Sequence, residues 1–204
     1  MSLFPIVQGF FLGAGMIIPI GAQNAFILNQ GIKKQYHLIA AGICMAGDVL
    51  LISVGIFGGS QLLASSELAF TILTWLGILF LVGYGLLSFK AVIKPVNSKE
   101  SKFETGKTLS KVVLTCLAVT LLNPHAYIDT IVILGGVGGQ FVGDAKINFA
   151  IGCILASIVW FYGLAILSAR MSKFLGRTNV KRGIDLVVGL IMWGIAGSLF
   201  WSWY

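Results

Sequence analysis

Long stretches without an ionised side chain are the feature that most limits what this chain can fold into. No Asp, Glu, Lys or Arg precedes Lys33, and residues 68–89, 147–169 and 186–204 carry none. A bilayer core of roughly 30 Å needs about 20 apolar residues of helix. Only 10% of the chain is charged, whereas a soluble domain averages about 25%. The sequence therefore predicts an all-α integral membrane protein.

The apolar runs divide the chain into six predicted transmembrane helices. They cover residues 4–28, 37–58, 68–89, 112–134, 147–169 and 185–203. No separate soluble segment is indicated, so residues 1–204 are predicted to form a single transmembrane domain.

The basic residues are distributed unevenly between the two sides of the predicted bundle. Of 14 Lys and Arg residues, 13 lie in the first, third and fifth connections, and only Lys146 lies on the other side. The positive-inside rule places these connections in the cytoplasm and both termini outside it. The formal charge of +7 is thus a topology signal. We expect the lipid bilayer, and not nucleic acid, to be the partner of this basic chain.

Two of the predicted helices are longer than a straight crossing requires. Residues 2–32 and 112–143 each carry a proline near their middle, Pro19 and Pro124. Proline removes a helical hydrogen bond and breaks or kinks the helix. At 1.5 Å per residue, both prolines lie about 20 Å from the cytoplasmic edge. We expect helices one and four to be broken there, at similar depth.

The sequences that follow the two prolines are alike. Residues 19–26 align with residues 124–130 with one gap. Because three crossings form an odd unit, a second copy has to insert upside down. We therefore expect two inverted three-helix repeats, 1–89 and 112–204, with the basic segment 90–111 as the cytoplasmic linker. Broken helices at matching places indicate the midplane site of a transporter, although Pro and Gly are also common in ordinary membrane helices.

Several short motifs together resemble a known family. They are Pro19-Ile20-Gly21-Ala22-Gln23-Asn24, Gln30-Gly31-Ile32, Gly47-Asp48-Val49, Leu122-Asn123-Pro124-His125-Ala126-Tyr127-Ile128-Asp129 and Ser157-Ile158-Val159-Trp160-Phe161. They resemble the lysine exporter superfamily of six-span amino-acid exporters, most closely its lysine/arginine exporter branch. The resemblance covers nearly the whole chain and departs where relatives usually have a second proline in place of Ala22. It implies export of basic amino acids across a bacterial inner membrane and no enzymatic activity.

Asp48 and Asp129 are the acids in the interior of the predicted helices, whereas Asp185 is the first residue of the last one. Asp48 lies about 16 Å into the bilayer from His37, a depth where an aspartate costs roughly 2.5–3.5 kcal/mol. No Lys or Arg lies within any predicted span. We expect each aspartate to bind a proton or the substrate cation during alternating access, so that export is coupled to proton antiport or to the membrane potential. An interfacial carboxylate is the alternative for Asp129, which lies nearer the outer face.

The helix breaks offer groups for the α-carboxylate of an amino acid. Asn123 is expected to cap a half-helix that starts at Pro124, where free N–H groups suit an anion. The stretch from Gly21 to Asn24 offers the same in the other half, with Gln23 and Asn24 as donors. The alternative is that these side chains only satisfy backbone groups freed by the breaks.

Other residues have weaker signals. Tyr127 and Trp160 are candidates for cation–π stacking on a guanidinium, with ordinary packing as the alternative. Cys44, Cys116 and Cys153 fall in three different spans with no close pair and are expected to be packing residues.

The remaining alternatives concern assembly and substrate. Gly9 and Gly13 have the spacing that permits close helix approach, either within the chain or in a homo-oligomer. Asp48 and Asp129 also suit a divalent metal ion as cargo, but Cys and His do not cluster, which disfavours a soft metal. An exporter of neutral amino acids and a non-transporting membrane assembly or redox protein stay as rivals. We expect no catalytic residues, no resident metal and no cofactor.

Overall fold

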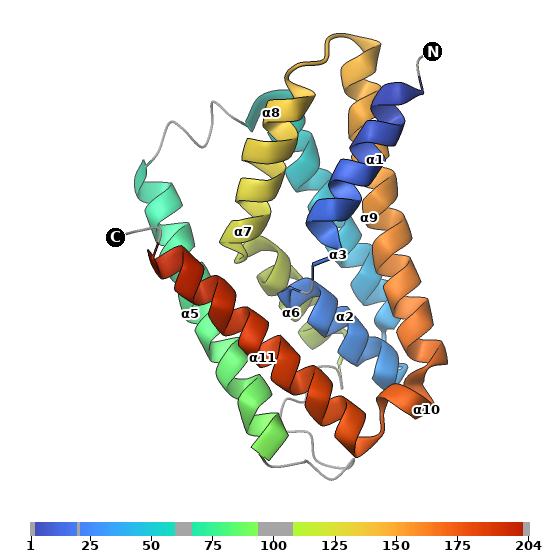
Figure 1. The fold of residues 1–204 in the computed structure, drawn as a ribbon, viewed down its shortest axis with the longest axis vertical. Coiled ribbons are helices and arrows are strands. Elements are labelled where there is room, and N and C mark those ends of the chain that lie inside the picture. Colours follow the sequence, from blue (N-terminus) through green and yellow to red (C-terminus); the bar gives the residue numbers. More distant parts are fainter. Residues whose placement is uncertain (1–2, 20, 60–66, 94–107, 202–204) are drawn as a thin grey trace.

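The computed structural model describes residues 3–19, 21–59, 67–93 and 108–201, and every regular element in these ranges is helical, as predicted. In chain order the elements are α1 (Phe4–Ile17), α2 (Ala22–Lys33), α3 (His37–Val54), η1 (Gly55–Gly59), α5 (Glu67–Ile93), α6 (Leu109–Leu121), α7 (Pro124–Tyr127), η2 (Ile128–Leu134), α8 (Gly135–Gly138), α9 (Asp144–Arg170), α10 (Ser172–Leu175) and α11 (Thr178–Trp201) (Figure 1). The elements η1 and η2 are π-helical. Most of the predicted linker 90–111 lies outside the described residues.

Several of these helices are suited to a membrane. His37–Gly58 and Asp144–Arg170 are long and apolar enough to cross it, with mean hydropathies of 2.1 and 2.2. Taken together, α1 and α2 are also long and apolar enough to cross a membrane, and the pair is bent by 79° at the break between them. The described residues thus contain two candidate spans, or three if the bent pair is one crossing. The other predicted spans fall on α5, α11 and the stretch from α6 to α8, and the count of six stays a prediction.

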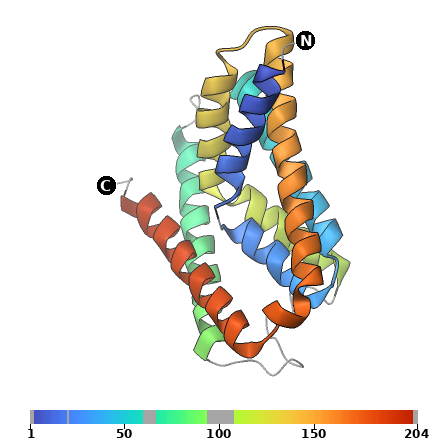
Figure 2. The ribbon, with the colours of Figure 1, turned by 45° about the vertical axis from the view of Figure 1, so that its right-hand side comes forward.

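Both predicted helix breaks are present. The helix α1 ends at Ile17, and α2 begins at Ala22 after Gly21, whose backbone is extended (φ −113°, ψ −171°). In Figures 1 and 2, α2 leaves the line of α1 and slants across the bundle. The second break separates α6, which ends at Leu121, from α7, which begins at Pro124. Proline is favoured at a first helical position because its missing N–H would have no partner there.

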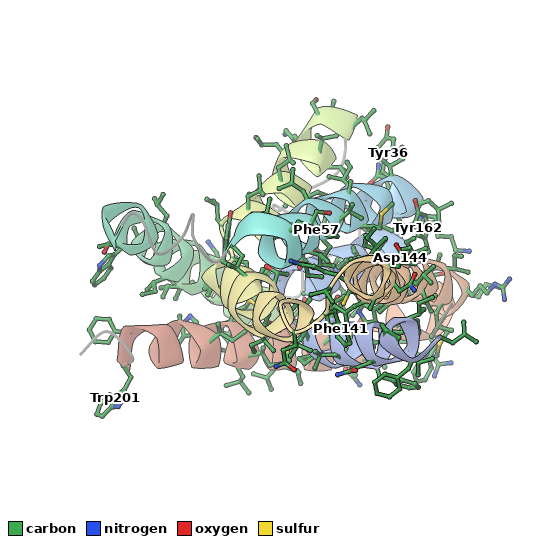
Figure 3. The ribbon with its side chains drawn as sticks, turned by 90° about the horizontal axis from the view of Figure 1, so that it is seen from above. Tyr36, Phe57, Phe141, Asp144, Tyr162 and Trp201 are labelled. Carbon is green, nitrogen blue, oxygen red and sulfur yellow. The ribbon has the colours of Figure 1, made fainter. Side chains whose placement is uncertain are left out.

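The two halves of the chain pack mainly against each other. Both α1 and α2 lie against α9 of the second half, whereas α6 and η2 lie against α3 of the first half. Two further contacts join α3 to α9 and α5 to α11. Seen from above, the α5–α11 pair stands to one side of the other helices, and Trp201 at its end points away from them (Figure 3). The interface between the halves therefore forms the interior of the protein.

Glycines allow α1 and α9 to approach closely. A Cβ atom on Gly9 would collide with the backbone of α9, and one on Gly152 would collide with the backbone of α1. A Cβ on Gly13 would lie 3.1 Å from a Cα atom of α9. The spacing of Gly9 and Gly13 thus serves a contact within the chain. The prediction of a homo-oligomer is not tested by this contact.

Two cysteines meet where α3 packs on α6. The Cys116 thiol donates a hydrogen bond to the Ala40 carbonyl (Sγ to O, 3.8 Å), and Cys44, one turn further along α3, interacts with the Cys116 side chain. All three cysteines are buried, in keeping with a packing role. The expectation of no close pair is wrong for Cys44 and Cys116, because helices distant in the sequence bring them together.

Candidate functional site

Asp48 is a buried carboxylate on α3 with 6% of its surface exposed. Its Oδ1 accepts a hydrogen bond from Gln23 Nε2 on α2 at 3.3 Å, and its Oδ2 accepts one from Ser157 Oγ on α9 at 2.9 Å. Both donors are neutral, and no lysine or arginine in the described part of the chain forms an ion pair with Asp48. A buried carboxylate without a countercharge attracts a proton or a cation.

The side-chain amide of Gln23 joins three helices. Its Nε2 donates to Thr120 Oγ1 on α6 at 3.0 Å as well as to Asp48 on α3, so both of its hydrogens are used. Thr120 is 1% exposed and reaches this position because Gly47 on α3 has no Cβ to collide with the threonine methyl group. The amide thereby fixes the first turn of α2 against α3 and α6.

Asn24 connects the two sides of the first break. Its Nδ2 donates to the carbonyl oxygens of Ile17 and Pro19, both at 2.8 Å, and its Oδ1 accepts from Trp160 Nε1 on α9 at 3.0 Å. Carbonyls at the end of a helix have no helical partner of their own. The Asn24 amide therefore satisfies backbone groups freed by the break, which is the role considered as the alternative for this residue.

The residues predicted around the second break lie on α7, on η2 or just before them. Asn123 precedes Pro124, and its carbonyl accepts a backbone hydrogen bond from within α7 at 3.1 Å. The Tyr127 hydroxyl donates to the carbonyl of Leu121 at 2.9 Å, so this side chain bridges α6 and α7. Asp129 is half-buried in η2.

The predicted site residues thus fall into two groups. One group lies around the first break and forms two separate hydrogen-bonded pairs, Gln23 with Asp48 and Asn24 with Trp160. The other belongs to the second break: Asn123, Tyr127 and Asp129. Within the described ranges, no group of three or more His, Cys, Asp and Glu side chains is arranged to hold a metal ion.

Ser157 and Thr120 complete the hydrogen-bond network of Asp48 and Gln23, here called the Asp48 network. Neither is among the predicted site residues. Each is a small hydroxyl in an apolar run, so neither composition nor charge distinguishes it from packing residues. Ser157 does precede Trp160 by three residues, which places both on one face of a helix. That spacing and its place in the motif from Ser157 to Phe161 were the signals for Ser157, whereas Thr120 has none.

Comparison with known proteins agrees with the resemblance found in the sequence. The model of the LysE type translocator family matches residues 14–202. The arginine exporter protein ArgO of Serratia proteamaculans (strain 568) is 45% identical over 196 residues, which are 96% of each chain. The ArgO proteins of Yersinia enterocolitica and Salmonella enteritidis are 46% and 47% identical and cover 95% and 94% of this chain and 94% and 91% of their own. No solved structure matches the chain significantly.

A family model that spans nearly the whole chain agrees with relatives that align over more than nine tenths of both chains and with long apolar helices. Membrane translocation, and not enzymatic catalysis, is the activity of such a protein. The chain belongs to the LysE type translocator family.

Proposed function

We propose that this protein exports arginine, lysine or both from the cytoplasm across a bacterial inner membrane. The observation that carries the proposal is the buried carboxylate of Asp48, which has neutral hydrogen-bond donors and no cationic partner among the described residues. A guanidinium or ammonium group supplies the positive charge that this environment lacks. The relatives' printed name, arginine exporter, supports the same substrate class.

In the proposed mechanism, Asp48 and Asp129 each bind either a proton or the cationic end of the substrate. Trp160 lies on the same face of α9 as Ser157, the donor to Asp48, which makes its ring the candidate for cation–π contact at that acid. Tyr127 is the aromatic candidate at the second break. The substrate and the proton compete for the same carboxylates, which couples their movements.

The α-carboxylate of the substrate is oriented by the polar groups at the breaks. Gln23 lies in the first turn of α2, where backbone N–H groups and the helix dipole favour an anion. Asn123 holds the corresponding place before α7. Substrate binding in this way replaces hydrogen bonds that the same side chains make within the protein.

Proton antiport has an energetic reason. Moving one positive charge outward against an inside-negative potential costs about 2.3 kcal/mol per 100 mV. Returning one proton for each cationic substrate cancels that charge movement. We therefore propose exchange of a proton for the amino acid, with alternating access around Asp48 and Asp129.

The proposed architecture has six spans in two inverted repeats, and the packing of the helices supports it. If α1 corresponds to α6 and α3 corresponds to α9, then the contact of α1 with α9 corresponds to that of α6 with α3. The correspondence also pairs α2 with the stretch of α7 and η2, and α5 with α11. The contact of α2 with α9 then corresponds to that of η2 with α3, and the contact of α2 with α11 corresponds to that of α7 with α5. Such an exchange of partners is what a two-fold axis in the membrane plane produces.

The proposed orientation rests on charge. The ends of α2, α9 and α11 that meet at α10 carry many basic residues, whereas the opposite connection before α9 carries Asp144 and Lys146. Placing the basic end in the cytoplasm puts both termini outside it.

The test is efflux of labelled arginine, lysine and threonine from loaded proteoliposomes. We expect the wild type to release the two basic amino acids faster than threonine. Asp48→Asn should lower their flux at least 100-fold because the neutral amide cannot bind the cation, and Asp129→Asn should lower it by a smaller factor. Asp144→Asn, which changes an exposed acid at the start of α9, should leave it unchanged. Equal flux of all three substrates, unaffected by Asp48→Asn, would refute the proposal.

A further inference from the structure

A second cluster of ionisable side chains lies where the end of α2 meets the beginning of α11. Lys33 is in the last turn of α2, and Lys181, Arg182 and Asp185 are in the first turns of α11. Asp185 is 9% exposed, and its charged neighbours are Lys181 and Lys33. Lys33 likewise has Lys181 and Asp185 as its charged neighbours. Cations are therefore crowded around one buried carboxylate.

Asp185 faces the interior of the protein, whereas Lys181 and Arg182 are half-buried and Lys33 is exposed. Asp185 is three and seven residues before Val188 and Met192, so the three side chains share one face of α11. Val188 and Met192 are 3% and 0% exposed, and they belong to the same hydrophobic core as Ala22 and Phe26 of α2. This face of α11 therefore continues into the bundle toward α2, the helix whose Gln23 donates to Asp48.

Arg182 in this cluster has one N–H group that lacks an acceptor. Its Nε atom is buried and has no hydrogen-bond partner in the part of the chain that the structure describes. Arg182 is three residues from Asp185, so the two lie on the same side of α11. The cluster holds three cations and one anion. A buried guanidinium N–H without an acceptor is unfavourable, and an anion that accepts from it relieves that cost.

We propose that this cluster is a cytoplasmic entry subsite for the zwitterionic end of an amino acid. Arg182 and Lys181 bind the α-carboxylate, and Asp185 binds the α-ammonium group. This arrangement rests on the proposed export of amino acids. It explains why a transporter of cations carries cations beside a buried carboxylate: they recognise the carboxylate of the substrate and turn its positively charged side chain away, toward Asp48.

The entry subsite is separate from the Asp48 site. Gln23, which binds Asp48, and Lys33 are ten residues apart on α2, a rise of about 15 Å. That span exceeds the length of one amino acid, so a substrate occupies the two sites one after the other. Because both sites contact α2, release from the first and capture at the second involve the same helix.

The test compares arginine with agmatine, which is arginine without its carboxylate, in efflux assays with the cytoplasmic face of the protein exposed to the substrate. For the wild type we expect agmatine to need a higher half-saturating concentration than arginine. Arg182→Gln should raise the half-saturating concentration of arginine at least fivefold, to that of agmatine. It should change the maximal rate and the half-saturating concentration of agmatine by less than twofold. Arg177→Gln, which changes an exposed arginine that lies over the Phe174 ring, should change neither.

Several outcomes would overturn the subsite. If Arg182→Gln leaves the half-saturating concentration of arginine unchanged, or raises those of arginine and agmatine equally, the carboxylate is not recognised there. A difference between wild type and variant that disappears in vesicles without anionic lipid would assign the cluster to a lipid headgroup. If Arg182→Gln does not fold, Lys181→Gln is held to the same criteria. Absence of arginine flux in the wild type would refute the proposed function itself, whereas flux without these effects would refute only the subsite.

Discussion

The two helix breaks begin alike and are held differently. Beyond Pro19, α2 is a regular α-helix of 12 residues, and Asn24 donates hydrogen bonds back to the carbonyls on the near side of the break. Beyond Pro124, one turn of α-helix leads into a π-helix of seven residues. Proline interrupts the helix in both places. The geometry that follows depends on the polar groups that are available to satisfy the freed backbone.

The polar groups of the two halves also differ in which helix carries the acid. Asn24 and Asp129 each lie five residues after their proline. In the first half, the residue five positions after the proline is the neutral Asn24, and the acid is Asp48 on the next helix. In the second half, the residue at that position is itself the acid, Asp129, and the next helix carries Ser157. If the halves are inverted repeats, each supplies one carboxylate from a different helix. The hydrogen bond of Ser157 to Asp48 would then join corresponding helices.

The largest effect is expected at the first break. Asn24→Asp replaces an amide donor with a group that cannot donate to two carbonyls at once, and we expect a loss of about 1–3 kcal/mol in unfolding free energy. The measurement is thermal unfolding in detergent. Asn29→Asp is the control, because its amide only donates to Ala25 within α2 at 3.2 Å. An equal loss in Asp129→Asn would show that both breaks depend on this position in the same way.

A smaller effect is expected from the serine that joins α9 to Asp48. Ser157→Ala removes one donor to the carboxylate and should lower arginine flux about tenfold, which corresponds to about 1.4 kcal/mol. Ser157→Thr keeps the hydroxyl and should recover most of the flux. Ser168→Ala is the control on the same helix, because that buried hydroxyl bonds to Ala165 three residues away. If both alanine variants lose flux equally, Ser157 has no specific effect on Asp48.

The smallest effect is expected at the second break. Thr130 is 8% exposed and donates to the Ala126 carbonyl at 2.6 Å, within the π-helical region. Thr130→Val should cost about 1 kcal/mol or less, because one neutral hydrogen bond is lost. Thr115→Val on α6 removes a similar bond to Lys111 at an exposed position and is the control for thermal unfolding. A loss as large as that of Asn24→Asp would contradict the difference between the breaks.

Local sequence was sufficient to predict the breaks and the acid but not its partners. Pro19 and Pro124 indicate interruption because the missing N–H acts on its own helix, and Asp48 is prominent because charge is scarce in apolar runs. Its donor Ser157 lies 109 residues away, and a serine in such a run does not reveal which helix it faces. Asp185 is the first residue of the last predicted helix, a position that does not indicate burial, and its burial depends on the packing of α11 against α5 and α2.

The exchange of packing partners between the halves has a consequence for biosynthesis. The helix α1 emerges from the ribosome long before α9, the helix on which its glycines pack, and α5 likewise precedes α11. The helices of the first half are therefore synthesised before the helices that cover them. Contacts between parts that are distant in the sequence form late, after the chain has been held in an incomplete state. Assembly of this transporter is therefore complete only when α9 and α11 have packed against the helices of the first half.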